Sequence, residues 1–217
     1  MIGSSGGYLV GMELLLIRHG LPVRRELREG IADPDLAPAG QQQAKHLAEY
    51  LSSEEIDALY SSPQRRAVQT VEPIAAARAL AIGIVDDVAE WDRNASAYVP
   101  IEELKAENDP RWQAMVRGEW TADDDTPEGF RTRVVSAIEA LIAEHNGHRI
   151  VVSCHGGVIN AYLAHVLGLP VGQGFFYPNY TSIHRVMASR AGHRSVITVN
   201  ETAHLRGTGL PIGLLQS

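Results

Sequence analysis

Two histidines in this chain share an unusual setting, because each follows a short apolar run and stands directly before glycine. The first run, LLLI, leads into Arg18, His19 and Gly20, and the second, VVSC, leads into His155 and Gly156. Burial in a core accounts for the apolar residues but not for the histidines. Since imidazole can act as a nucleophile or exchange protons near neutral pH, the repeated pattern favours a chemical role over a packing role.

An arginine pair supplies a third candidate element. In the stretch SSPQRRAVQT, Arg65 and Arg66 fall in the first turn of an expected helix, where the helix dipole disfavours cations. Two solvated side chains are one interpretation, and an anion bound at the helix start is the other. Guanidinium groups match phosphate oxygens and imidazole can attack phosphorus, so the arginines and histidines together suit phosphate chemistry. Arg18 beside His19 supports the same interpretation.

These residues need a scaffold that brings distant segments together, and the apolar pattern predicts one. Short apolar runs predict strands at residues 12–17, 56–61, 82–85, 149–154, 183–187 and 195–199. Helical spacing predicts a helix at 35–53 and another at 158–168. It also predicts a helix that begins at Pro63 with Ser62 as its N-cap, and one that begins after an N-cap at Thr126 and ends at Gly147. This alternation implies an α/β fold, a three-layer α/β/α sandwich whose mostly parallel central sheet has helices on both faces. Ligands in such sheets bind beyond the carboxyl ends of the strands, where both histidines fall.

The stretch from residue 91 to about residue 125 interrupts the alternation. It has three tryptophans, several charges and no strand pattern, which indicates a small helical insertion that acts as a cap over the site. Its aromatic residues either line a substrate lid or pack the cap onto the domain; they are Trp91, Tyr98, Trp112 and Trp120. Residues 12–217 are expected to form one domain after a flexible leader at residues 1–11, with Met12 as an alternative start.

Composition narrows the classes of function. Nineteen Lys and Arg against 26 Asp and Glu give a net charge of −7, so the whole chain has no electrostatic reason to bind nucleic acid or an anionic membrane. The single cysteine, Cys154, excludes an internal disulfide framework and a Cys-rich zinc site. No stretch approaches the ~18 consecutive apolar residues of a spanning helix, and we therefore expect a cytoplasmic protein. A monomer and a homodimer are both compatible with the sequence.

Three stretches together resemble a known family. LLLIRHG, SSPQRRAVQT and VVSCHGG look like the three motifs of the histidine phosphatase superfamily, the phosphoglycerate mutase-like proteins, and they occur in that family's order. The match runs from about residue 12 to about residue 199. Each motif is weak by itself, whereas their joint occurrence is highly specific. The resemblance implies an enzyme that acts on a small phosphorylated substrate without a metal or another cofactor.

The resemblance also implies a role for each matched residue. His19 matches the nucleophile that becomes phosphorylated, and its other ring nitrogen is expected to donate to local backbone. Arg18 and Arg66 match phosphate clamps, and His155 matches the second histidine that holds the phosphoryl group. Glu90 falls where the family places its proton donor. The nearby acids that could take this role instead are Asp86, Asp87 and Asp92.

Small residues and further arginines complete the expected binding site. Gly20 and Gly156 lack side chains and so let phosphate approach the backbone. Arg65 is expected at the surface or the rim. Arg24 and Arg25 form either a solvated basic loop or a rim that recruits a second anionic group of the substrate.

Departures from the family pattern favour hydrolysis over isomerisation. Phosphoglycerate mutases continue after the catalytic glutamate with Arg-His-Tyr-Gly, whereas this chain has Trp-Asp-Arg-Asn at residues 91–94. We therefore expect a phosphatase in which His19 attacks a small phosphomonoester, Glu90 protonates the leaving oxygen and water cleaves the phosphohistidine. The nearest alternative is a mutase-type phosphoryl transferase. A further alternative is a regulatory or binding protein that holds a phosphate ligand without turnover.

Overall fold

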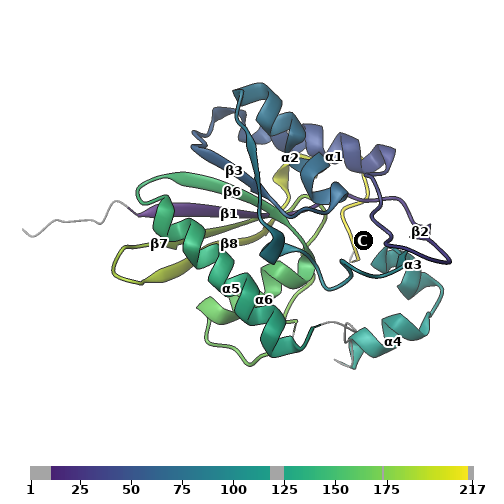
Figure 1. Ribbon diagram of the computed structural model, residues 1–217. Coiled ribbons are helices and arrows are strands. Elements are labelled where there is room, and N and C mark those ends of the chain that lie inside the picture. The colour runs from purple at the N-terminus through teal and green to yellow at the C-terminus, as the bar shows by residue number, and fades with distance from the viewer. Residues whose placement is uncertain (1–10, 118–124, 173, 215–217) are drawn as a thin grey trace, which may run out of the picture.

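The computed structural model describes residues 11–117, 125–172 and 174–214, so most of the expected leader and Trp120 lie outside the described residues. Six strands form one mixed sheet in the order β4-β3-β6-β1-β7-β8 (Figure 1). Their bounds are Met12–Arg18 (β1), Ala58–Ser61 (β3), Ile82–Ile84 (β4), Arg149–Cys154 (β6), Ile183–Ala188 (β7) and Arg194–Glu201 (β8). The four strands from β4 to β1 are parallel, and β7 and β8 add antiparallel pairings. The expected mostly parallel sheet is confirmed.

Helices cover both faces of this sheet. One face carries α1 and α2 and the other carries α5 and α6; their bounds are Pro38–Tyr50, Arg65–Arg78, Pro127–Glu144 and Gly156–Val166 (Figure 1). Successive side chains of β1 point to opposite faces, so Leu14 and Leu16 pack in the core under α5 and α6. Leu15 and Ile17 pack in the core under α1 and α2. The two cores confirm the three-layer sandwich.

The parallel pairing of β1 with β6 brings the two histidine motifs together. Arg18 at the end of β1 lies in register with Cys154 at the end of β6. The backbone N–H of His19 donates to the carbonyl of Cys154 at 2.9 Å. His19 and His155 therefore leave the sheet side by side, although they are far apart in the sequence.

Three helices begin at residues other than those predicted. α1 begins at Pro38, after the predicted start at residue 35. α2 begins at Arg65 with Gln64 as its N-cap, so the prediction of Ser62 as N-cap and Pro63 in the first turn is wrong, although Arg65 and Arg66 do lie in that turn. The Ser62 hydroxyl contacts His155 instead of capping the helix. α6 begins at Gly156, earlier than the predicted start at residue 158, because its first two residues are glycines, which apolar spacing does not register.

The start of α5 agrees with the sequence. Thr126 is its N-cap and accepts the N–H of Gly129 at 3.0 Å, and Pro127 occupies the first position. Short 3₁₀ helices complete the domain at Leu51–Ser53, Asp86–Val88 and Ala203–Leu205. Over the ranges given above, no helix is both long enough and apolar enough to cross a bilayer.

The insertion contains helices, as expected, and also a strand that its pattern does not reveal. The helices are α3 (Ile101–Ala106) and α4 (Pro110–Val116). The strand β5 (Ala97–Tyr98) pairs antiparallel with β2 (Arg25–Glu26). A strand of two residues is too short to show a period, and its partner lies in a distant loop. This small sheet and α3 lie to the right in Figure 1, beyond the carboxyl end of β1.

Candidate active site

His19 has the hydrogen bond that a nucleophilic imidazole needs. Its Nδ1 lies 2.7 Å from the carbonyl oxygen of Gly20, which can only accept, so Nδ1 carries a proton. Burial first, and then the charges of Arg66 and Arg18, hold the pKa of His19 well below its ordinary value. The ring is therefore neutral near pH 7 and keeps a lone pair on Nε2.

His155 engages the opposite ring nitrogen. Its Nε2 lies 2.7 Å from Oγ of Ser62, and its buried Nδ1 has no hydrogen-bond partner in the described part of the chain. The rings of His155 and His19 lie 5.2 Å apart between centroids. Burial and the charge of Arg66 hold the pKa of His155 well below its ordinary value. When the Ser62 hydroxyl donates to Nε2, the ring proton resides on Nδ1 and can be donated to a ligand.

Arg66 is a fully buried cation in the first turn of α2. Its Nη2 donates to both carboxylate oxygens of Asp92, at 2.7 and 2.9 Å. Its Nε and Nη1 are buried and lack a partner among the residues described. Buried donors are normally hydrogen-bonded, and a helix N-terminus favours negative charge. Arg66 is thus prepared to bind an oxyanion.

Arg18 provides a second guanidinium from the end of β1. Its Nη1 donates to the carbonyl of Pro178 at 2.5 Å, and within the described ranges its buried Nε has no partner. The charges of Arg18 and Arg66 both lower the pKa values of His19 and His155, so the four side chains share one small region. Unpartnered nitrogens of three side chains thus lie close to the free Nε2 of His19. This arrangement suits a phosphoryl group.

Glu90 is the acid whose surroundings favour its protonated form. Burial is the main cause that raises the pKa of Glu90, and the charge of Asp92 adds to it. Its Oε2 accepts the N–H of Gly157 at 2.8 Å, next to His155. Both oxygens of Asp92 accept hydrogen bonds from Arg66, so this carboxylate is already engaged. Asp86 and Asp87, which the sequence also offered as proton donors, are exposed in the 3₁₀ helix before Glu90.

The glycines of the two motifs have different reasons to be small. A Cβ on Gly157 would lie 2.3 Å from Oε1 of Glu90, and a Cβ on Gly20 would lie 2.9 Å from the Gly40 carbonyl oxygen in α1. Both positions therefore exclude a side chain because of close packing. A Cβ on Gly156 would have no neighbour nearer than 4.0 Å, so packing leaves space there.

Several polar residues make hydrogen bonds to residues of the site, although the sequence analysis gave them no role. The Thr70 hydroxyl accepts the N–H of Gly20 at 2.9 Å and donates to the Arg66 carbonyl at 2.7 Å. Oε1 of Gln43 accepts the N–H of Leu21 at 2.8 Å. Thr70 ends the stretch SSPQRRAVQT, one helical turn after Arg66, and this spacing was the available signal for it. The position of Gln43 carried no comparable signal.

Two tyrosine rings lie beside the guanidinium groups of Arg66 and Arg18. The Tyr98 ring lies 4.5 Å from Cζ of Arg66, and the Tyr180 ring lies 4.3 Å from Cζ of Arg18. Their centroids lie 6.4 and 6.1 Å from that of His19. Burial raises the pKa of Tyr98 to about 12, so its hydroxyl stays protonated. Tyr98 was one of the aromatic lid candidates, whereas nothing in the sequence singled out Tyr180.

The other described aromatic residues of the insertion make packing contacts. Trp91 stacks on Phe130 of α5 at 3.9 Å with an angle of 10° between the rings. Trp112 lies 6.3 Å from Tyr177 between ring centroids. These contacts hold the insertion on the domain.

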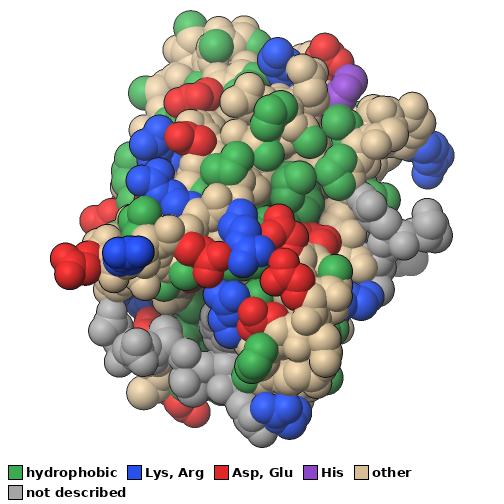
Figure 2. Space-filling view, turned by 90° about the vertical axis from the view of Figure 1, so that its right-hand side faces the viewer, with side chains coloured by type: hydrophobic (Ala, Val, Ile, Leu, Met, Phe, Trp, Pro, Cys, Tyr) green, Lys and Arg blue, Asp and Glu red, His purple; other side chains and the backbone are tan. Residues whose placement is uncertain are grey.

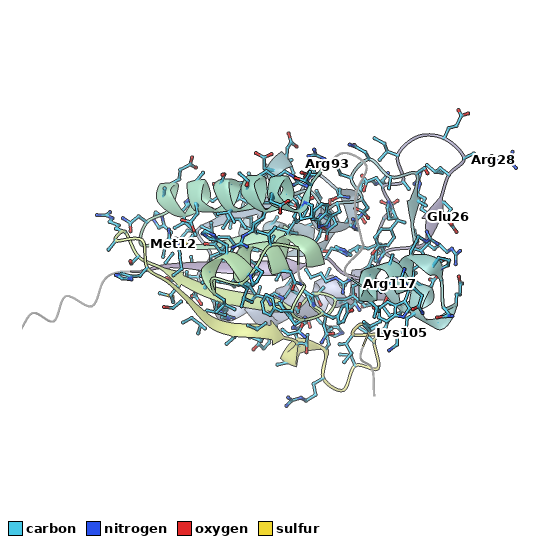
Figure 3. The ribbon with its side chains drawn as sticks, turned by 90° about the horizontal axis from the view of Figure 1, so that it is seen from below. Met12, Glu26, Arg28, Arg93, Lys105 and Arg117 are labelled. Atoms are coloured by element: carbon cyan, nitrogen blue, oxygen red, sulfur yellow. The ribbon has the colours of Figure 1, made fainter. Side chains whose placement is uncertain are left out.

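The arginines after the first motif lie on the outside of the molecule. Arg24 forms ion pairs with three carboxylates at 2.7 to 3.2 Å, those of Glu26, Glu103 and Glu107. Figure 2 looks onto this side and shows basic side chains set among acidic ones. Arg25 is exposed on β2, and Figure 3 shows Arg28 at the outer turn of the loop. The pairing of Arg24 leaves little net positive charge there for a second anionic group.

Known proteins resemble this chain in sequence and in fold. Residues 14–202 match the family described as Histidine phosphatase superfamily (branch 1). Phosphoserine phosphatase 1 of Hydrogenobacter thermophilus is 27% identical over 201 residues, which cover 89% of this chain and 94% of that protein. Phosphoglycerate mutase-like protein 4 of Arabidopsis thaliana is 32% identical over 162 residues, covering 69% and 68%. Phosphoserine phosphatase from Entamoeba histolytica, solved with phosphoserine, has the same fold, with a TM-score of 0.70, 23% identity and coverage of 89% and 99%.

Proposed function

This chain belongs to the histidine phosphatase superfamily (branch 1), and we propose that it hydrolyses a small phosphomonoester through a phosphohistidine on His19. The observation that supports this most directly is the group of buried, unpartnered nitrogens of Arg18, Arg66 and His155 in the described structure, beside the neutral His19. A phosphoryl group brings oxygens that accept from these nitrogens. Nε2 of His19 has the free lone pair that attack on phosphorus requires.

In the first half of the proposed reaction, Nε2 of His19 attacks phosphorus in line with the ester oxygen. The N–P bond forms as the P–O bond to the leaving group breaks, and Glu90 transfers its proton to the departing oxygen. Arg18, Arg66 and His155 hold the remaining phosphoryl oxygens. The Gly20 carbonyl that accepts from Nδ1 stabilises the positive charge that phosphorylation places on the ring.

In the second half, water attacks the phosphohistidine. A P–O bond to water forms, the N–P bond breaks, and the Glu90 carboxylate takes a proton from the attacking water. His19 returns to its neutral form with the proton on Nδ1, and inorganic phosphate leaves. Glu90 is then protonated again, so one ester and one water give one alcohol and one phosphate.

The substrate we propose is a phosphomonoester with a small leaving group. His19 is 3% exposed, and Tyr98 and Tyr180 stand beside the clamps, which limits the space for the rest of the substrate. Phosphoserine is the first compound to test, because two of the similar proteins are named as phosphoserine phosphatases. A panel of phosphorylated metabolites would extend the test.

The deciding experiment is phosphate release from 4-nitrophenyl phosphate in the presence of a metal chelator. The protein should turn over this ester, and His19→Ala should lower kcat by about 10³-fold or more because the nucleophile is gone. Arg65→Gln is a matched control, since Arg65 is 54% exposed and paired with Asp35, and its kcat should stay within about twofold. Unchanged hydrolysis by His19→Ala would refute the proposal.

Phosphoryl transfer between two hydroxyl groups is the second candidate, because one similar protein has a mutase-like name. Incubation with 3-phosphoglycerate and a trace of 2,3-bisphosphoglycerate separates the two activities. Release of free phosphate supports a phosphatase, and interconversion of the phosphoglycerate isomers supports a mutase. A stoichiometric, acid-labile phosphoryl group without turnover would instead support a binding or regulatory protein.

A further inference from the structure

Gln64 and Asp92 form a polar link behind the catalytic side chains, and the proposed reaction does not use it. Gln64 is 6% exposed at the N-cap of α2, and the side chain of Asp92 is 16% exposed in the loop after Glu90. Nε2 of Gln64 donates to Oδ1 of Asp92 at 2.9 Å. Polar groups this deeply buried lower stability unless their hydrogen bonds are made, and here they are made to residues of the site.

Asp92 occupies one nitrogen of the Arg66 guanidinium, and this determines which N–H groups remain for a ligand. Both of its oxygens accept from Nη2, which leaves Nε and Nη1 as the buried donors without partners in the described structure. The guanidinium is planar and rigid, so fixing Nη2 fixes the directions of the other two N–H groups. Such alignment matters because a misplacement of about 1 Å can lower a rate by about 10²-fold.

Gln64 connects the same link to the acid and to the second histidine. Its Oε1 accepts the backbone N–H of Glu90 at 2.8 Å. Its own backbone N–H donates to Oγ of Ser62 at 3.3 Å, and this oxygen lies 2.7 Å from Nε2 of His155. Arg66, Glu90 and His155 come from three separate segments. Gln64 hydrogen-bonds Glu90 directly and is linked to Arg66 through Asp92 and to His155 through Ser62.

We propose that Asp92, held by Gln64, is a positioning residue of this site: it orients Arg66 toward the phosphoryl group and, through Gln64, fixes Glu90 on the leaving-group side. The reaction itself rests on the proposed function, to which this adds a supporting pair. Asp92 is not assigned as the proton donor, because its oxygens already accept hydrogen bonds from Arg66 and Gln64.

Because Asp92 is an acid beside Glu90, the proposal also predicts how its removal changes the pH dependence of kcat. Asp92 raises the pKa of Glu90, next after burial. The other groups that interact with Glu90 from the packed elements are Arg66 on α2, the Cys154 thiol on β6, and the backbone N–H groups of Trp91 and Gly157. Arg133 on α5 donates to the carbonyl of the preceding residue, Ala89. Removing the charge of Asp92 lowers the pKa of Glu90, so Glu90 loses its proton at a lower pH. The alkaline limb of kcat should move to lower pH.

The test compares two esters. 4-Nitrophenolate leaves readily without a proton, whereas the alkoxide of glycerol 2-phosphate needs one. Asp92→Asn should lower kcat for 4-nitrophenyl phosphate by about tenfold, because Arg66 is no longer held, and for glycerol 2-phosphate by about 100-fold, because proton donation by Glu90 suffers as well. Gln64→Leu removes the link without changing charge, so kcat should fall in the same sense while the alkaline limb stays in place. Asp86→Asn, an exposed acid in the preceding 3₁₀ helix, is the control and should change neither quantity.

Equal losses on both esters with an unmoved alkaline limb in Asp92→Asn would overturn the proposal. A wild-type protein without turnover on any ester would defeat the proposed function separately. The positioning role would then be judged by NMR titration of ¹³C-labelled glutamate, with the Glu90 signal assigned from Glu90→Gln. A lower pKa of Glu90 in Asp92→Asn supports the proposal, and an unchanged titration overturns it.

Discussion

His19 and His155 stand at the ends of neighbouring parallel strands, each before a glycine, yet they engage opposite ring nitrogens. Nδ1 of His19 meets the Gly20 carbonyl, whereas Nε2 of His155 meets the Ser62 hydroxyl. A carbonyl can only accept, so it fixes the tautomer of His19 and frees Nε2 for attack. A hydroxyl can donate, which lets His155 carry its proton on Nδ1 and offer it to an oxyanion. The same local sequence thus serves two roles, and the partner atom separates them.

The largest effect that tests this comparison concerns the donor on His155. His155→Ala should lower kcat by about 10²- to 10³-fold, as the loss of one oxyanion donor does elsewhere. His155→Asn should recover at least about tenfold of this loss, because its amide nitrogen can occupy the position of Nδ1. His155→Gln reaches the position of Nε2 and should recover little. Equal kcat values for the Asn and Gln variants, measured by phosphate release, would contradict the assignment of Nδ1 as the donor nitrogen of His155.

The two glycines after His155 give a smaller steric effect. Gly157→Ala places a Cβ 2.3 Å from Oε1 of Glu90, so the acid must move and kcat should fall by about tenfold or more. Gly156→Ala meets nothing nearer than 4.0 Å and should unfold at the same temperature as the wild type. Weaker phosphate binding by a folded Gly156→Ala, measured by calorimetry, would show that the ligand uses that space. A fully active Gly157→Ala would contradict the assigned position of Glu90.

The Ser62 hydroxyl provides a further test of the difference between the two histidines, with an expected change of about fivefold in kcat/KM. Ser62→Ala removes the hydroxyl whose donation to Nε2 would leave the ring proton of His155 on Nδ1, and one hydrogen bond of this kind is worth about 1 kcal/mol. We expect kcat/KM to fall by about that factor. ¹⁵N NMR of the imidazoles should show mainly the Nδ1–H form in the wild type and a mixture in the variant. The Nε2–H form in the wild type would contradict the donor role of His155.

The smallest expected effect is on stability. The pKa values of His19 and His155 are lowered in the folded protein, so below the ordinary histidine pKa the unfolded chain binds more protons. The free energy of unfolding should therefore fall as pH falls below about 6.5, by at most ~1.4 kcal/mol per pH unit for each such histidine. His155→Asn removes one of them and should make the fall less steep in urea titrations between pH 7.5 and 5.5. Identical slopes would show that His155 is not held neutral.

Most of the sheet could be predicted because burial leaves a local pattern. The apolar run of β1 and the Thr126 cap with Pro127 in α5 are readable in a few consecutive residues. The pairing of β2 with β5 could not be predicted, because two residues at 25–26 and two at 97–98 have no period. The start of α2 was misplaced because Ser62, a good capping residue, makes its contact with His155 instead.

For the candidate site, too, the sequence indicated the residue types but not the contacts that each side chain makes. The residue types at positions 18, 19, 66 and 155 suggested phosphate chemistry, and the structure brings these four side chains together. The resemblance placed Glu90 as the proton donor, but the sequence left Asp86, Asp87 and Asp92 as alternatives. In the structure Arg66 and Gln64 occupy Asp92, while Oε2 of Glu90 accepts the N–H of Gly157, and these contacts favour Glu90 as the proposed acid.

The sequence by itself determined the chemistry available to this protein, because residue type sets which side chains can attack phosphorus, bind its oxygens or donate a proton. It also determined the sandwich, because apolar spacing reports burial over short distances. Only the tertiary structure shows which ring nitrogen of each histidine has a protein partner and which acid has a raised pKa. Those properties depend on contacts made across segments, such as Ser62 with His155 and Asp92 with Arg66, and on the burial that these contacts share.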